Sequence, residues 1–368
     1  MATVFKKCKK GKDPCTDSKC KHPWTVRYRE PGGRSGKQRE ASFERKKSAD
    51  AFKTKVENEK NEGTYLNPDR GKITVKDWAE HWLSSRPVGE LTKVGYESFI
   101  TTHVIPLLGK KPLRSVTRSD IQKFVSQLSA EMSPTTVANR KVVLSAIFND
   151  AVKDDRIPSN PCRGVPTPRT RENKLDLDRI PSLDEIVEIS EKLPDRLQLT
   201  VWLMAGAGLR VAEALAVSEE TVRDGYLRLR WQVQLRKDST GKKVPTLVPL
   251  KHRAEGDYRD VPIPHSLQEN ISSHIERFGT LDGQLFFNKN DLVTYASYRG
   301  LWVYRESRYT PHDLRHWFAS TALAGDVSLL EVSRWLGHKS IQETADTYGH
   351  LVYDSPDRLR SVMQSALA

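Results

Sequence analysis

The sequence predicts a multidomain protein: a small N-terminal α+β module, an all-helical bundle, and a larger, mainly helical domain with a small antiparallel sheet. Alternating bulky and polar residues indicate strands near the N-terminus, and apolar residues recur at helical spacing over 73–157. A proline-rich segment then separates this part from the remainder. A chain of 368 residues is long enough for two or three domains.

Composition and charge narrow the class of protein. The chain has 60 Lys or Arg against 47 Asp or Glu, a formal net charge of +13. The first 72 residues hold 20 of the basic and 10 of the acidic residues, so most of the excess lies there. A basic N-terminal module indicates a polyanionic partner, most often nucleic acid, although solubility alone is the simpler explanation.

The chain shows no targeting or membrane signal. No apolar run approaches the ~18 residues of a membrane span, and the lysine-rich start is followed by no hydrophobic region. We therefore expect a cytoplasmic or nucleoid-associated protein.

The N-terminal domain, placed at 1–66, is predicted from its strand and helix patterns. Segments 24–29 and 39–43 alternate as strands do around a Pro-Gly-rich turn, and apolar residues follow helical spacing over 48–62. The pattern predicts a sheet of up to three strands plus a helix. Such an arginine-rich ribbon could enter the major groove of DNA, and an ordinary solvated sheet face is the alternative.

Three of the four cysteines crowd the N-terminus beside a histidine. Cys8, Cys15, Cys20 and His22 could supply three thiolates and one imidazole to a tetrahedral zinc site. Their spacing is looser than that of paired Cys-x-x-Cys knuckles, so reduced cysteines without metal are an equal alternative. No disulfide framework is expected without a secretory signal.

Residues 73–157 predict a compact helical bundle. Thr74 stands at an N-cap position, and Ser133 precedes the proline that opens a long helix. A helix over 91–104 is expected to be stopped by Pro106 and Gly109, because proline cannot continue the hydrogen-bond pattern.

The remainder divides into a linker and a third domain. Prolines and arginines over 158–180 predict a semi-extended linker. Residues 181–368 form the third domain, which is mostly helical with a strand-rich interval over 226–264.

Two arginines of the third domain are candidates for binding a phosphodiester. An arginine fork bonds two phosphate oxygens and stays protonated, which suits Arg210 and Arg315 to the charge that develops when a phosphodiester is attacked. A single arginine is more simply a surface charge. His312 and Arg315 are three residues apart on one helical face, however, and this pairing favours a site.

Tyr348 is the candidate nucleophile, with Tyr353 as its competitor. A phenol of pKa about 10 needs a base and positive neighbours. His312 could accept the proton and His338 could donate to the phosphate. His316 is interpreted as structural.

A leaving 5′ oxygen also needs a proton. Lys251 precedes a predicted strand in the strand-rich interval and is the candidate donor. Lys242 and Lys243 lie in the same interval and remain alternatives.

Four short motifs occur in a fixed order. They are Gly208-Leu209-Arg210-x-x-Glu213, His312-x-x-Arg315, Leu336-Gly337-His338, and a tyrosine ten residues after His338. Each motif alone is weak, but the four together are specific. The chain resembles the tyrosine recombinases, in particular phage or integrative-element integrases of actinobacterial type, over nearly its whole length.

The resemblance implies a fold and a set of roles. It implies a tyrosine recombinase or type IB topoisomerase-like catalytic domain, preceded by a SAM-like core-binding bundle and an arm-site-binding domain. The implied roles are phosphate binding by Arg210 and Arg315, general acid catalysis by Lys251, proton transfer by His312, phosphate contact by His338, formation of a 3′-phosphotyrosine by Tyr348, and orientation of the arginine by Glu213.

The resemblance also implies the reaction and its partners. It implies a metal- and ATP-independent strand transferase that integrates and excises a phage or mobile element at attachment sites. Its partners would be double-stranded core and arm sites, three further copies of the chain in a tetramer, a directionality factor and a host DNA-bending protein. The apolar spacing over 359–367 fits a helix that docks on a neighbouring subunit.

Two other classes of function remain open from the sequence. His312-x-x-x-His316 has the spacing of a zinc-hydrolase helix, although Asp313 stands where a glutamate base would be needed. A DNA-binding regulator with a silent active site is the second alternative. A chromosome-dimer resolvase fits less well, because the basic N-terminal module suits an integrase that bridges arm and core sites.

Overall fold

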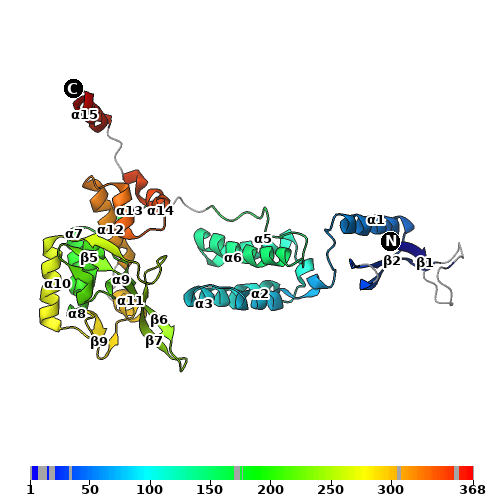
Figure 1. The fold of residues 1–368 in the computed structure, drawn as a ribbon, viewed down its shortest axis with the longest axis horizontal. Helices are drawn as coiled ribbons and strands as arrows, with labels where there is room; N and C mark the ends of the chain where they lie inside the picture. Colours follow the sequence, from blue (N-terminus) through cyan, green and yellow to red (C-terminus); the bar gives the residue numbers. More distant parts are fainter. Residues whose placement is uncertain are drawn as a thin grey trace. The chain divides into compact units, whose positions relative to one another are not determined.

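The structure is a computed structural model that describes residues 2–6, 15, 21–32, 35–169, 175, 177–304, 308–351 and 356–367. The chain forms two compact units, Met1–Thr170 and Arg171–Ala368 (Figure 1). None of the described helices is long and apolar enough to cross a membrane.

The first unit begins with a three-stranded antiparallel sheet and a helix, as predicted. The sheet has the order β1-β2-β3, with β1 at Thr3–Lys6, β2 at Trp24–Arg29 and β3 at Gln38–Phe43. Helix α1 (Lys46–Asn61) packs Ala49 and Val56 against Val26 and Tyr28 of β2. Since side chains alternate along a strand, Arg27 and Arg29 lie on the face of the sheet opposite α1.

A helical bundle completes the first unit. Its elements are α2 (Val75–Ser84), α3 (Glu90–Phe99), the π-helix η3 (Ile100–Val104), α4 (Ile105–Leu108), α5 (Arg118–Glu131) and α6 (Pro134–Lys153), with the short turns η2 (Arg70–Lys72) and η4 (Leu113–Ser115). The side chains of Thr74, Thr117 and Ser133 cap α2, α5 and α6 at their N-termini. The indole N–H of Trp78 donates to the carbonyl of Ile147 at 3.0 Å and joins α2 to α6.

Of the two predicted helix stops, Pro106 is wrong and Gly109 is confirmed. The chain continues from α3 through the π-helix into α4, and Pro106 lies in the first turn of α4. The wider turn accommodates a residue that has no N–H to donate. The helical path ends at Gly109.

The proline-rich segment begins as part of the bundle. Ile157, Cys162 and Val165 are buried in the bundle core. The Asn160 amide donates to the backbone carbonyl of Ser145 at 3.0 Å and so fastens the segment to α6. The chain therefore leaves the packed bundle after Val165, later than the predicted start of the linker at 158.

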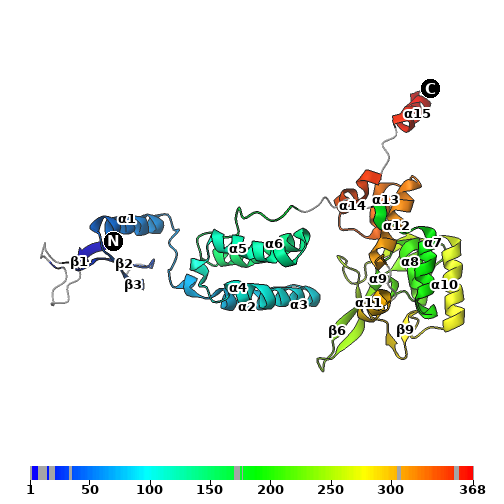
Figure 2. The ribbon, with the colours of Figure 1, turned by 180° about the vertical axis from the view of Figure 1, so that it is seen from behind.

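The second unit is mainly helical with small antiparallel sheets, as predicted (Figures 1 and 2). Its helices are η5 (Leu177–Arg179), α7 (Leu183–Lys192), α8 (Asp195–Ala207), α9 (Val211–Ala214), η6 (Glu219–Thr221), α10 (His265–Phe278), α11 (Tyr295–Tyr304), α12 (Pro311–Ala324), α13 (Leu329–Leu336), α14 (Ile341–Tyr348), η7 (Gly349–Leu351) and α15 (Pro356–Leu367). Its strands are β4 (Val222–Arg223), β5 (Tyr226–Leu229), β6 (Trp231–Lys237), β7 (Lys243–Pro249), β8 (Arg259–Pro262), β9 (Phe287–Asn288) and β10 (Asp291–Leu292).

The strands of this unit form three separate pieces. The first is a sheet in the order β4-β5-β8, the second is the β6–β7 hairpin, and the third is the short β9–β10 pair. Figures 1 and 2 both show the β6–β7 hairpin projecting from the helical body. The base of the hairpin is fixed to the body, because β6 packs against α9.

Helix α8 is the centre of this unit and sets the position of the site. It packs against α7, α10 and α12. It ends at Gly208, whose φ of +61° is left-handed. A Cβ at this position would lie 2.5 Å from Phe318 of α12, so glycine lets α12 approach the end of α8. The chain then turns directly into Arg210 and α9.

Candidate active site

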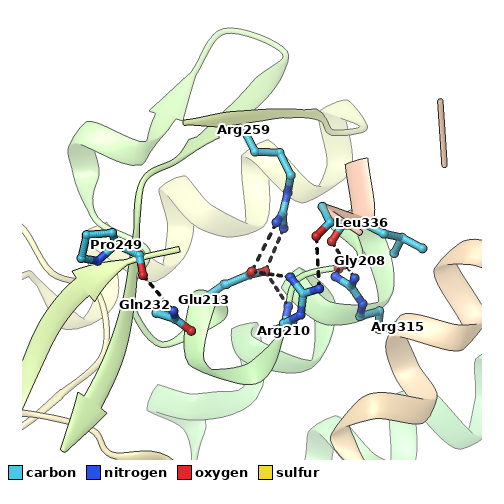
Figure 3. Close-up of polar contacts among 9 residues, drawn as sticks. Gly208, Arg210, Glu213, Gln232, Pro249, Arg259, Arg315 and Leu336 are labelled. Carbon is cyan, nitrogen blue, oxygen red and sulfur yellow. Dashed lines mark hydrogen bonds and ion pairs between the residues drawn. The ribbon is translucent and has the colours of Figure 1, made fainter. Parts of the chain in front are cut away.

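The site is organised around Glu213, a buried carboxylate in α9 that contacts two arginines (Figure 3). Arg210, at the N-cap of α9, donates to it from its backbone N–H and from Nη1, each at 2.9 Å. Arg259, from β8, donates to the same carboxylate from Nη2 at 2.8 Å and from Nη1 at 3.2 Å. Glu213 thus joins the loop after α8 to the small sheet.

The ionisation of Glu213 depends on these arginines. Burial alone would raise the pKa of its carboxyl, but Arg259, and then the charges of Arg210 and Arg315, outweigh burial and lower that pKa to about 2. The carboxylate is therefore charged at neutral pH.

Arg315 lies on α12 and is fully buried. Its Nη1 donates to the carbonyl of Gly208 and its Nη2 to the carbonyl of Leu336, both at 2.6 Å. Nearby, Arg210 Nη2 donates to the carbonyl of Gly337 at 3.3 Å. The carbonyls at a helix C-terminus lack intrahelical partners and carry partial negative charge, so the ends of α8 and α13 both hold Arg315.

The cluster has an excess of positive charge. Three arginines, at 210, 259 and 315, surround the single carboxylate of Glu213. Burial, together with the charge of Arg210, lowers the pKa of Arg315 to about 9, which still leaves its guanidinium protonated at neutral pH. The buried Nε–H groups of Arg259 and Arg315 have no hydrogen-bond partner in the described structure. Unsatisfied donors and uncompensated charge both favour an anion here.

Three histidines adjoin the arginines. His312 and His316 lie one turn apart on α12, with ring centroids 4.6 Å apart. His338 follows Gly337 after α13, and its Nδ1 is 2.7 Å from Thr344 Oγ1. Burial, reinforced by neighbouring positive charge, lowers the pKa of His312 and of His316 to about 4 and that of His338 to about 3. All three imidazoles are therefore neutral at pH 7.

Tyr348 ends α14 and is only 1% exposed. Its ring belongs to an apolar cluster with Ala319 and Leu323 of α12 and with Leu336 of α13. Its hydroxyl oxygen lies 2.6 Å from Nδ1 of His316. Burial raises the pKa of the phenol to about 12, although Arg315 acts in the opposite direction, so the hydroxyl keeps its proton at neutral pH.

Lys251 lies apart from this hydrogen-bonded group. It is exposed, in the turn that follows β7 at the base of the β6–β7 hairpin. Lys243 pairs with Lys237 at the other end of the hairpin. That end is six residues from the Trp231–Pro249 pair at the base, which corresponds to about 20 Å along a strand. Lys242 is also at that far end, so Lys251 is the lysine of the three closest to the body.

Two residues of the site were not assigned from the sequence. Arg259 is 4% exposed and shares Glu213 with Arg210. Arg259 stands two residues before the buried Val261 in β8, so both lie on the same face of the strand. This spacing is the signal that could have identified Arg259. His316, interpreted as structural, contacts the Tyr348 hydroxyl. That contact spans 32 residues, and no local pattern reveals it.

The residues behind the zinc-hydrolase alternative have other partners. The Asp313 carboxylate accepts from the backbone N–H and the hydroxyl of Thr310 at 2.7 and 2.8 Å, as the cap of α12. It also pairs with Arg179 at 3.3 Å. Within the described ranges, no group of three His, Cys, Asp or Glu side chains could hold a metal ion. Asp313 therefore acts as a helix cap in this fold.

Some predicted residues fall where the structure gives no description. Cys8, Cys20 and the competitor Tyr353 lie outside the described residues. Cys15 and His22 are described, and the backbone N–H of Cys15 donates to the carbonyl of Lys6 at 3.0 Å.

Sequence comparisons identify the family of this chain. The pattern of the phage integrase family matches residues 174–354, and that of the phage integrase N-terminal SAM-like domain matches 74–129. A putative prophage phiRv2 integrase of Mycobacterium tuberculosis is 29% identical over 286 residues, which cover 74% of this chain and 73% of that protein. A tyrosine recombinase XerC of Vibrio parahaemolyticus is 30% identical over 236 residues, or 60% of this chain and 68% of that protein.

Solved structures share the fold. A Tn1549 transposon integrase in complex with a circular intermediate DNA superposes with a TM-score of 0.64 at 19% identity, covering 80% of this chain and 99% of that one. A lambda integrase from a tetramer bound to a Holliday junction gives 0.54 at 20% identity, covering 86% and 94%. The chain belongs to the phage integrase family of tyrosine recombinases, and it is a site-specific DNA recombinase.

Replacing Glu213 with glutamine should destabilise the second unit by about 3 kcal/mol or more at pH 7, because two arginines lose their buried counter-charge. Urea unfolding would measure this.

The Glu213 pKa is lowered in the fold, so the contribution of Glu213 to stability is present above the unfolded pKa of about 4.3 and is lost as pH falls toward 2. The variant should therefore lose less stability than wild type below pH 4. Glu188→Gln, in an exposed pair with Lys192, is the matched control. Equal stability of the two variants would contradict the prediction.

Proposed function

We propose that this recombinase is an integrase that integrates and excises a phage or mobile element at attachment sites, through a 3′-phosphotyrosine intermediate. The observation that carries the proposal is the cluster of Arg210, Arg259 and Arg315 around the carboxylate of Glu213, in which the charge of Arg315 also acts on the Tyr348 phenol. The similarity to a prophage integrase supports the biological setting.

The arginines would bind and polarise the scissile phosphate. Arg210 and Arg315 would contact its non-bridging oxygens, which gain charge as Tyr348 attacks phosphorus. Because the guanidiniums are already held by Glu213 and by backbone carbonyls, little reorganisation is needed in the transition state. His338, with its ring oriented by Thr344, would add a neutral donor to the phosphate.

Lys251 would protonate the leaving 5′ oxygen. It stands at the base of the β6–β7 hairpin, beside the segment that leads into Arg259. An exposed lysine on a turn can follow the DNA backbone more readily than a buried one. His312, next to Arg315 on α12, would complete the set of proton-transfer groups.

Positively charged groups do in this site what a divalent metal does in other nucleases. The arginines stabilise the developing charge, and the phosphotyrosine conserves the bond energy for rejoining, so neither metal nor ATP is required. Tyrosine recombinases catalyse without a cofactor.

The basic face of the N-terminal sheet would bind arm sites, while the helical bundle would bind the core site. Arg27 and Arg29 lie on the sheet face opposite α1, where β3 contributes Gln38 and Glu40. Arginine and glutamine are residues that read base edges in the major groove. Glu40 pairs with Arg27 at 2.9 Å and would have to exchange that contact for DNA.

The active assembly would be a tetramer on two DNA duplexes, as the lambda integrase tetramer is on a Holliday junction. Helix α15 carries the exposed apolar side chains Met363 and Leu367, which would dock on a neighbouring subunit. A directionality factor and a host DNA-bending protein would regulate the reaction at the chromosome, in the bacterial cytoplasm.

Tyr348→Phe should abolish the covalent protein–DNA adduct while leaving DNA affinity within about twofold, since only the nucleophilic oxygen is removed. The core site is first identified by selecting bound duplexes from a random library. A nicked version then traps the adduct, because the short 5′-hydroxyl strand diffuses away after cleavage. Gel electrophoresis of the denatured adduct is the measurement. An adduct with the phenylalanine variant would rule out Tyr348 as the nucleophile.

Arg27→Ala and Arg29→Ala should each weaken binding to one of two sequence classes that wild type selects from the library. Each variant should also reduce the salt slope of binding by about 1, as expected for one lost phosphate contact. Lys55→Ala, an exposed change on α1, is the control and should keep both classes. Unchanged selection by both arginine variants would remove the sheet from the arm-binding role.

The N-terminal cluster would bind one zinc ion per chain through Cys8, Cys15, Cys20 and His22. Cys8→Ser should lower the zinc content measured by atomic emission, since one thiolate ligand is lost. Cys162→Ser is the matched control, because Cys162 is buried in the helical bundle. Wild-type protein without zinc, after purification in zinc-containing buffer, would refute the site.

A further inference from the structure

The contact between His316 and Tyr348 goes beyond the roles assigned above. His316 Nδ1 lies 2.6 Å from the Tyr348 hydroxyl oxygen, which is hydrogen-bond distance. In the described structure, His316 is the side chain that hydrogen-bonds to this hydroxyl. His338 has its own Nδ1 partner in Thr344, and His312 contacts the His316 ring.

We propose that His316 takes the proton from the Tyr348 hydroxyl during strand cleavage and returns it during rejoining. The inference rests on the proposed role of Tyr348 as nucleophile. It places His316 among the catalytic residues, since it touches the reacting oxygen itself. His312, the proton-transfer group expected from the family, would then act at the phosphate.

The protonation states allow this transfer. The phenol keeps its proton, because burial raises its pKa to about 12. The imidazole is neutral, because burial lowers its pKa to about 4. A protonated phenol facing a neutral imidazole nitrogen at hydrogen-bond distance is the arrangement of a donor and a general base, as in serine and cysteine nucleophile pairs.

The charges around His316 explain why the base becomes stronger on DNA. On α12, Asp313 favours the protonated ring and Arg315 opposes it, while Arg179 of η5 and His338 before α14 also disfavour it. A phosphodiester bound to the arginines adds a negative charge beside this group. That charge offsets the arginines and stabilises the imidazolium that forms. The bound phosphate would thus make His316 a stronger base, and His316 would then activate Tyr348 to attack that phosphate.

The step balances without another reactant. The bond from Tyr348 Oη to phosphorus forms as the hydroxyl proton moves to His316 Nδ1. The bond from phosphorus to the 5′ oxygen breaks, and that oxygen takes a proton from Lys251. Rejoining reverses each transfer: the 5′ hydroxyl gives its proton to Lys251, and His316 protonates the departing tyrosine oxygen.

Two variants of His316 separate proton transfer from positioning. In His316→Asn, the side-chain carbonyl stands near the place of Nδ1 and accepts a hydrogen bond, but it cannot hold a proton at neutral pH. In His316→Ala both functions are lost. If His316 is the base, both variants should cleave the nicked core site at least about 100-fold more slowly than wild type. His265→Ala, an exposed histidine of α10, is the matched control and should react normally.

A substrate with sulfur in place of the bridging 5′ oxygen locates the defect. A thiolate leaves without protonation, because a thiol pKa of about 8.5 is far below that of an alcohol. Lys251→Ala should therefore recover on the sulfur substrate. The two His316 variants should remain slow on it, because they lack a group that acts on the nucleophile.

The outcomes separate this inference from the proposed function. His316→Asn reacting like wild type would show positioning alone and overturn the inference, as would recovery of the His316 variants on the sulfur substrate. Wild-type protein that forms no adduct would overturn the proposed function and the inference together. Unfolding midpoints and DNA affinities are measured for every variant, and if His316→Ala does not fold, His316→Asn and His316→Gln carry the comparison.

Discussion

The catalytic unit depends on one buried carboxylate. Glu213 holds Arg210 and Arg259, which come from the loop after α8 and from the small sheet. Without this charge, the guanidiniums of Arg210 and the buried Arg259 would repel each other and the buried Arg315. The carboxylate therefore allows the three guanidiniums to lie close together despite their mutual repulsion. The cluster still keeps enough excess positive charge to attract a phosphate.

The backbone supplies the second half of this arrangement. Helices α8 and α13 both end in left-handed glycines, Gly208 and Gly337, and the carbonyls at those ends accept from Arg315 and Arg210. A Cβ at 337 would collide with the Arg259 guanidinium. The two glycines of the sequence motifs are thus required by close approach as much as by turn geometry. The arginines thus hold the C-terminal ends of α8 and α13 in place, and the carbonyls at those ends hold the arginines.

Much of this could be predicted from the sequence, because the signals are local. Caps such as Thr74 and Ser133, the basic N-terminal sheet, and the motifs around Arg210, Arg315 and Tyr348 are written in short stretches of residues. What escaped prediction is non-local. Arg259 reaches Glu213 across 46 residues and His316 reaches Tyr348 across 32, and only the folded core brings them together. The path through Pro106 escaped because a π-turn relieves a restriction that holds in regular α-helices.

The burial of Tyr348 has a consequence for when this enzyme can cut. Tyr348 is only 1% exposed, so the surrounding side chains cover it in this conformation. Among the segments around it is Leu175, whose backbone N–H donates to the carbonyl of Thr347 at 3.1 Å and whose side chain packs on the same apolar cluster. Leu175 lies near the start of the second unit, within the segment 158–180 that the sequence predicts as a linker. If Tyr348 is the nucleophile, as proposed, a phosphate would meet its hydroxyl only after the packing around α14 loosens, and that movement would have to keep His316 at the hydroxyl.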